Sequence, residues 1–220
     1  MTLPAAIAKT AKGKPGAPGR PKDLSKGAAI LEAAKRLFLE QGYEGVSMDQ
    51  IAADAGVSKL TVYSHFGDKE ALFGEAVKAY CEQQLPSALF TDCAGLPVRD
   101  CLLEIGHAFV AMVMSPGAVA GHRIMCTPQM AASPVPQMFW DAGPRRVQKN
   151  FAELLAHKVE AGELAIDDVA RAASQFFVLL KGDLHAQQVF GCGAAAGDAR
   201  TLQRHVAETV DMFLRAYAVR

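Results

Sequence analysis

The stretch from Ser47 to Phe66, SMDQIAADAGVSKLTVYSHF, limits the folds open to this chain more than any other segment. Ile51 and Ala55 lie four positions apart, so they share one face of a short predicted helix. Gly56 follows that helix and permits the sharp turn that a side chain would resist. Ser58 is then placed to cap a second helix by accepting from its free backbone N–H groups. The stretch therefore predicts two short helices joined by a tight turn.

The second predicted helix has an apolar face and an outer face. Val62 and Phe66 lie four positions apart and are expected to hold this helix against its neighbours. The side chains expected to point outward are Lys59, Leu60, Thr61, Tyr63, Ser64 and His65. Two helices joined in this way form a helix-turn-helix, whose second helix enters the major groove of DNA. The pattern therefore favours a DNA-binding unit.

Residues 26–75 contain the segments LFLEQGYEGVS, IAADAGVSKLTVYSHF and DKEALF. In these segments the chain resembles the N-terminal domain of the TetR/AcrR family of transcriptional regulators. A later segment, GDLHAQQVFG at Gly182–Gly191, resembles the AefR-type subgroup of C-terminal domains. The resemblance implies a regulator, expected to act as a repressor, that binds a palindromic operator and is released by a small apolar or amphipathic effector.

The expected DNA contacts follow from the outer face of the second helix and from the resemblance. Tyr63 and His65 are expected to bind phosphates, whereas Lys59 and Thr61 lie at the helix start, where base edges are within reach. Lys69 opens the next helix, where a cation opposes the helix dipole unless a phosphate docks there. The full predicted set is Ser47, Ser58, Lys59, Leu60, Thr61, Tyr63, Ser64, His65 and Lys69.

Charge and cysteine content restrict the alternatives. The formal net charge is zero, which neither supports nor excludes a nucleic-acid partner, so the motif has to support that interpretation. The five cysteines form no CxxC and no zinc-type spacing, so neither a metal site nor a cofactor is expected. The odd cysteine count favours reduced thiols in a cytoplasm. Residues 1–22 lack a secretory signal, and no apolar run is long enough to span a membrane, so a cytoplasmic location is expected.

Apolar periodicity predicts an all-α fold in three parts. Residues 1–24 are expected to be a disordered basic arm, either a solvated tail or an arm that touches DNA. Residues 25–70 are expected to form a three-helix helix-turn-helix domain, and residues 71–220 a helical bundle for effector binding and dimerisation. The expected helices are 26–41, capped by Ser25, then 47–54, 58–66, 68–85, 97–115, 118–127, 137–161, 166–190 and 199–217, with a proline-marked loop at 128–136 and a flexible connector at 191–197.

The last two predicted helices carry apolar residues on more than one side. In the final helix, Val206, Val210 and Phe213 belong to one row, while Met212 and Leu214 lie off it. A helix that is apolar on two sides needs a second partner, and a matching pair from another copy would form a four-helix interface. A short helix-turn-helix also reads few base pairs, and a two-fold dimer doubles its contacts. Both observations predict a homodimer through the last two helices.

An apolar cavity among the middle helices is the expected effector site. Its predicted lining consists of Phe109, Met112, Met125, Met138, Phe139, Trp140 and Phe177. Methionine-rich linings suit adaptable hydrophobic pockets, although the same residues at helical spacing are typical of an ordinary core. His107, His122 and His185 are candidates for orienting a ligand.

Two other interpretations stay open at this level. One is a regulator of the same fold that senses oxidation at Cys101, Cys126 or, most plausibly, Cys192 in its glycine-rich loop. The other is a helical enzyme or scaffold with an incidental helix-turn-helix. The chain has no GxSxG, P-loop or HExxH motif, so no catalytic residue is proposed.

Overall fold

The computed structural model of this chain describes residues 23–192 and 198–219. Over these residues the chain forms helices and no β-strand, with one isolated antiparallel bridge between Leu164 and Ala218, which confirms the all-α prediction. In the same residues no single helix is long and apolar enough to cross a membrane; α6 and α7 reach that length only together, as a pair bent by 65°. The expected arm at residues 1–24 lies, except for its last two residues, outside the described ranges.

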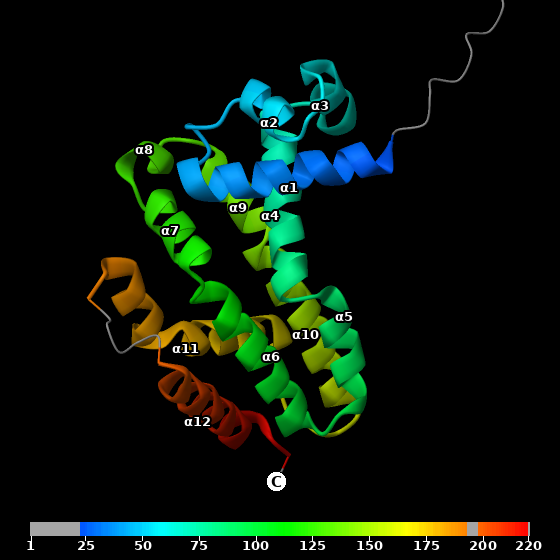
Figure 1. The fold of residues 1–220 in the computed structure, drawn as a ribbon. Helices are drawn as coiled ribbons and strands as arrows, with labels where there is room; N and C mark the ends of the chain where they lie inside the picture. The colour runs from blue at the N-terminus through cyan, green and yellow to red at the C-terminus, as the bar shows by residue number, and fades with distance from the viewer. Residues whose placement is uncertain (1–22, 193–197, 220) are drawn as a thin grey trace, which may run out of the picture.

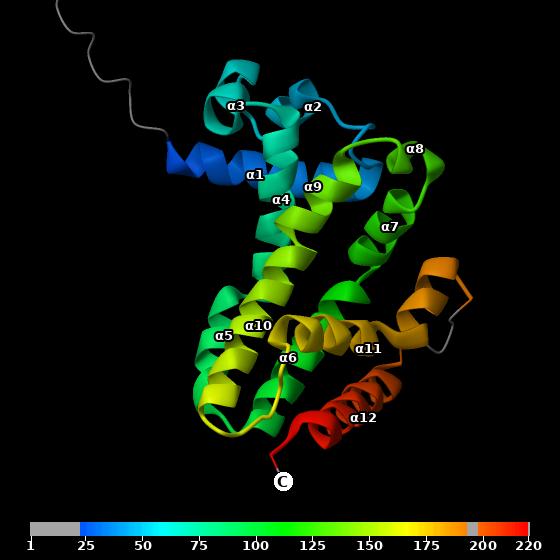
Figure 2. The same ribbon diagram turned by 180° about the vertical axis from the view of Figure 1, so that it is seen from behind.

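The helices, in chain order, are α1 (Leu24–Gln41), α2 (Met48–Asp54), α3 (Lys59–Phe66), α4 (Lys69–Gln84), α5 (Ser87–Asp92), a 3₁₀ turn η1 (Cys93–Gly95), α6 (Val98–Val113), α7 (Pro116–Met125), α8 (Pro128–Ala131), α9 (Val135–Ala142), α10 (Pro144–Glu160), α11 (Val169–Phe190) and α12 (Ala199–Tyr217). Figure 1 shows α2 and α3 at one end of the molecule, above α1, and α12 at the opposite end. The reverse view in Figure 2 shows the same order, with α4 running from the α1–α3 end toward the body.

Two hydrophobic cores lie along this axis. The N-terminal core joins α1, α2, α3 and the first half of α4, and it also receives Met130 from α8 and Val135 from α9. The C-terminal core joins the second half of α4 to α5, α6, α10, α11 and α12. Because α4 supplies Leu72 and Phe73 to the first core and Cys81 to the second, it belongs to both. The boundary expected between residues 70 and 71 falls inside the N-terminal core.

Side-chain caps fix where the helices of the helix-turn-helix begin. Ser47 and Gln50 form a reciprocal capping box at the start of α2, as the sequence predicts. Ser58 caps α3 by accepting from the backbone N–H of Thr61 at 3.2 Å. The expected cap of α1 is wrong: Asp23, not Ser25, accepts from the backbone, and α1 begins at Leu24. The carboxylate of Asp23 also accepts from the Ser25 hydroxyl, so Ser25 is a donor in this cap.

The prolines begin helices where the sequence predicts a loop. The segment 128–136 contains α8 and the start of α9, with Pro128 and Pro136 in their first turns. Proline is tolerated there because the first helical N–H groups have no intrahelical acceptor. The single helix expected over 137–161 is likewise two helices, α9 and α10, separated at Gly143. Pro144 begins α10, and the residue before a proline is disfavoured in the helical region.

Helix α11 is shorter than expected and is kinked. It begins at Val169, capped by Asp168, and Gly182 interrupts it with φ of 50° and ψ of −157°. Glycine is the residue that adopts this conformation at low cost. His205 of α12 fills the kink, with its Nε2 3.2 Å from the carbonyl of Leu179 and 3.0 Å from that of Leu180. The kink therefore also joins α11 to α12.

Candidate nucleic-acid interface and internal cavity

Helix α3 presents the outer face that the sequence predicts. Val62 is fully buried beneath it, and Phe66 is half-buried. Leu60 is 79% exposed and Tyr63 is 42% exposed, so an apolar side chain and a phenol both face solvent on this short helix. Ser58 and Thr61 share a hydroxyl–hydroxyl hydrogen bond of 2.8 Å at the helix start. An exposed leucine and tyrosine on one helix form a surface that suits a partner.

Lys59 has an ion partner within the protein. Its Nζ donates to a carboxylate oxygen of Asp49 on α2 at 2.9 Å. That hydrogen bond raises the pKa of Lys59, so the ammonium stays charged. Both side chains are exposed, and an exposed pair of this kind contributes little to stability. Lys59 can therefore exchange Asp49 for a phosphate or a base edge at small cost.

The other predicted contacts are partly occupied by local structure. Ser64 donates its hydroxyl proton to the carbonyl of Thr61 at 2.9 Å, and Ser47 is engaged in the capping box. His65 is half-buried rather than fully outward, because α3 packs on α1 and a Cβ at Gly27 would lie 3.2 Å from the imidazole Nδ1.

Lys69 has a structural partner that the sequence does not reveal. Its ammonium lies over the ring of Tyr43, 4.2 Å from the centroid, which is a cation–π contact. A second missed contact is the ion pair between Arg36 of α1 and Asp54 of α2, which raises the pKa of Arg36. Both pairs join residues from different elements, so helical periodicity carries no signal for either. The resulting frame fixes α2 on α1 beside α3.

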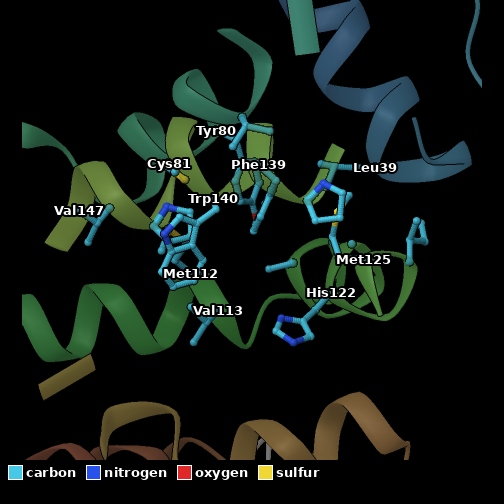
Figure 3. A pocket seen from close by; sticks show the side chains of 18 of the residues that line it. Leu39, Tyr80, Cys81, Met112, Val113, His122, Met125, Phe139, Trp140 and Val147 are labelled. Carbon is cyan, nitrogen blue, oxygen red and sulfur yellow. The ribbon is translucent and has the colours of Figure 1, made fainter. Parts of the chain in front are cut away.

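A cavity of about 450 Å³ lies between the two cores. Six of the seven residues predicted to line the effector site do line it: Phe109, Met112, Met125, Phe139, Trp140 and Phe177. Figure 3 shows Tyr80 and Phe139 on one side of this space and Val113 and His122 on the other. The walls come from α1, α4, α6, α7, α9, α10 and α11, so the cavity contacts elements of both cores.

Met138 does not line the cavity, contrary to the prediction. It packs against the N-terminal core. Val135 and Met138 are three positions apart on α9, so they face that core together, whereas Phe139 and Trp140 reach the cavity. The prediction treated this segment as the start of one long helix, which gave no information about which face turns inward.

Polar lining residues come mainly from α7 and α11. His122 and His185 face each other in a T-shaped contact with centroids 4.9 Å apart, and Lys181 lines the same cavity. Burial, followed by the nearby charges of His122 and Lys181, lowers the pKa of His185 to about 4. Burial also lowers the pKa of His122 and of Lys181. His107, the third candidate histidine, is exposed and does not line the cavity.

The low pKa of His185 predicts a loss of stability in acid. The unfolded imidazole binds a proton near pH 6.5, whereas the folded one does so only near pH 4. The free energy of unfolding should therefore fall as pH drops from 6.5 to 4, by up to about 3 kcal/mol. Urea denaturation at pH 7 and pH 4.5 measures this fall. The variant His185→Gln should show a smaller fall, and the exposed-site control His107→Gln should match the wild type; equal falls in all three would contradict the assignment.

The thiols and the metal question can be read from the same residues. Burial raises the pKa of Cys101 and also that of Cys81, the latter to about 11, which disfavours the reactive thiolate. Cys126 and Cys192 are exposed. Within residues 23–192 and 198–219, no group of three His, Cys, Asp or Glu side chains is arranged to hold a metal ion.

The molecule thus combines a helix-turn-helix end with an enclosed cavity in a helical body, which is the construction of a ligand-responsive DNA-binding regulator. Residues 30–76 match the family model for bacterial regulatory proteins of the tetR family. Residues 100–219 match the model for the C-terminal domain of AefR-like transcriptional repressors. The chain belongs to the TetR family and is a transcriptional regulator.

Solved structures and relatives agree with this assignment. A protein from Mesorhizobium loti assigned to the TetR family superposes with a TM-score of 0.74 at 29% identity, covering 89% of this chain and 98% of that one. The Flavonoid-responsive Regulator FrrA superposes with a TM-score of 0.68 at 32% identity, covering 90% of this chain and all of FrrA. The HTH-type regulator YdeS of Bacillus subtilis is 40% identical over 68 residues, which are 31% of this chain and 34% of YdeS.

TetR-family regulators bind operator DNA, act as dimers and bind small-molecule effectors. They are DNA-binding regulators rather than enzymes. The interpretation as an enzyme or scaffold with an incidental helix-turn-helix is therefore not favoured.

Proposed function

We propose that the chain is a dimeric cytoplasmic repressor that leaves a palindromic operator when a small apolar or amphipathic molecule fills the cavity. The single observation that carries this proposal is the position of α4. Its first half packs in the N-terminal core beneath α3, and its second half lines the cavity with Val77, Tyr80 and Cys81. A ligand against that wall touches the same helix that supports the recognition helix.

Release requires that the ligand distinguish two conformations. A ligand with equal affinity for the DNA-bound and released conformations would shift neither. The effector must therefore prefer a conformation in which the two recognition helices no longer match the spacing of the half-sites, about 34–36 Å or a multiple of it. The α4 wall is the element whose position such a ligand would bias.

The proposed dimer interface lies on α11 and α12. Val178 and Leu179 of α11 and Met212 of α12 are large apolar side chains left exposed in the single chain. The rows beneath them are already buried in the C-terminal core, so these side chains need a second partner. The matching helices of another copy would complete a four-helix interface.

The apolar lining supports an effector with an aromatic body. Phe109 and Phe177 lie 4.5 Å apart between ring centroids, and Phe139 and Trp140 add further rings. A cavity of this size and composition is typical of a site for a small organic ligand. FrrA, which is similar over its full length, is named for its response to flavonoids, which are aromatic molecules of suitable size.

Genomic footprinting with the purified full-length chain tests the proposal. The expected result is protection of a palindromic sequence with two half-sites, and loss of that protection when an aromatic effector is added. Binding only to unrelated sequences, with no palindrome recovered at low salt, would contradict it.

Two substitutions on α3 separate phosphate contacts from base contacts. Tyr63→Phe should weaken binding to the operator and to random DNA alike, by roughly 3- to 10-fold, because one hydrogen bond to a phosphate is lost. Lys59→Ala should instead relax the preference at one base position, by about 1–3 kcal/mol of discrimination. Fluorescence anisotropy with a set of operators mutated at single positions measures both.

The ion pair of Lys59 provides the matched control. Asp49→Asn removes the same pair but keeps the ammonium, so it should leave the base preference unchanged. If Lys59→Ala reduced binding to every sequence equally, Lys59 would be a phosphate contact and its assignment to a base would be wrong.

A further inference from the structure

The charged and titratable lining of the cavity is one-sided. Its charged residues are Lys35 and Lys181, and the imidazoles of His122 and His185 add two more basic groups. No Asp or Glu is among the described residues that line it. A cavity formed almost wholly by apolar side chains therefore holds basic groups with no acidic group among its lining.

Lys35 is compensated, but the α7–α11 group is not. Lys35 pairs with Glu32 at 2.7 Å and donates to Gln83 at 2.9 Å. Lys181, His122 and His185 make no hydrogen bond or ion pair to any described residue, and the two imidazoles meet only through their rings. His185 is just 6% exposed. We call these three residues the basic cluster.

An uncompensated basic cluster at an apolar wall complements an anion. Removing a cation from water without a counter-charge is unfavourable, and the lowered pKa values of all three groups have burial as their largest cause. An oxygen anion brought to the cluster would supply the missing partner, because charge-assisted hydrogen bonds to ammonium and imidazole are strong where water is excluded.

We propose that the effector is an organic acid with an apolar aromatic body, whose ionised oxygen binds Lys181 between His122 and His185. The inference rests on the proposed effector role of the cavity and names the class of molecule that fills it. The rings of Phe109, Phe139 and Trp140 contact the body, and the basic cluster selects the acid. Carboxylates and acidic phenols share this chemistry.

Paired probes test the acid preference by isothermal titration calorimetry on the full-length chain at pH 8. Biphenyl-4-carboxylate is compared with biphenyl-4-carboxamide, and naringenin with its 7-methyl ether, which lacks the acidic phenol. The wild type should bind at least one acid roughly 10- to 100-fold more tightly than its neutral counterpart. The pair that shows the difference identifies a carboxylate or a phenolate.

Substitutions of Lys181 locate the preference. Lys181→Met keeps the length of the side chain and should abolish the difference between acid and neutral probe, whereas Lys181→Arg should keep most of it. Lys149→Met removes an exposed lysine on α10 outside the cavity and should behave as the wild type.

Three outcomes overturn the inference: equal affinity for acid and neutral probes in the wild type, a preference that survives Lys181→Met, or no binding by any probe. The first still leaves the proposed function standing, because neutral probes that bind and release operator DNA would establish the cavity as an effector site. Failure of every ligand to release DNA, with footprinting positive, would remove the effector role itself.

Discussion

Replacing Phe151 with alanine is expected to lower the free energy of unfolding by about 3–5 kcal/mol, because the large cavity left behind cannot collapse. Phe151 is fully buried in the C-terminal core. Its ring lies 4.8 Å from that of Phe176 and 5.1 Å from that of Phe177, centroid to centroid. The ring also contacts Phe90 of α5, so one side chain joins three helices. Urea denaturation followed by circular dichroism measures the loss.

Phe190 provides the matched control for this prediction. It lies at the end of α11 and is 80% exposed. Phe190→Ala removes the same atoms from a site that water already reaches, so the expected change is within about 0.5 kcal/mol. If the two variants lost similar stability, Phe151 would not be the centre of the core that the structure indicates.

Replacing Leu179 with glutamate is expected to separate the dimer and to weaken operator binding by roughly 100-fold or more, because each base pair lost from the specific site costs about 1–3 kcal/mol. Leu179 is 37% exposed on α11, and in the proposed interface its side chain meets the partner copy. A carboxylate there would be buried without a counter-charge. Sedimentation velocity gives the oligomeric state, and fluorescence anisotropy gives the affinity.

The control for Leu179→Glu is Val219→Glu, which introduces the same charge at an exposed residue beyond the end of α12. This variant should remain dimeric and bind the operator as the wild type does. A Leu179→Glu protein that stayed dimeric would place the interface on other helices. A monomer with unchanged affinity would contradict the need for two recognition helices.

Signals that act within one helical turn could be predicted from the sequence. The capping box of Ser47 and Gln50, the cap at Ser58 and the positive φ of Gly56 each depend on residues a few positions apart. The same holds for α12, whose predicted bounds match those in the structure. Burial of Val62 follows equally from spacing on α3.

Features that depend on distant contacts were missed. Pro128 and Pro136 looked like loop residues because a proline that starts a helix and one that breaks it read alike in the sequence. Met138 turns away from the cavity because α9 packs on the N-terminal core, which is decided by tertiary packing. The basic cluster was overlooked as a unit because Lys181 is brought to His122 only by the packing of α11 on α7.

The sharing of α4 between two cores has a consequence for protein engineering. A chimaera that transplanted only residues 25–70 onto a foreign sensor would leave Leu72, Phe73 and Ala76 behind. It would also strip away Met130 and Val135, which reach back from α8 and α9 to seal the same interior. A workable breakpoint therefore lies after α4, and the recipient must offer apolar side chains to replace those two. In this molecule the unit that can be exchanged is larger than the unit that touches DNA.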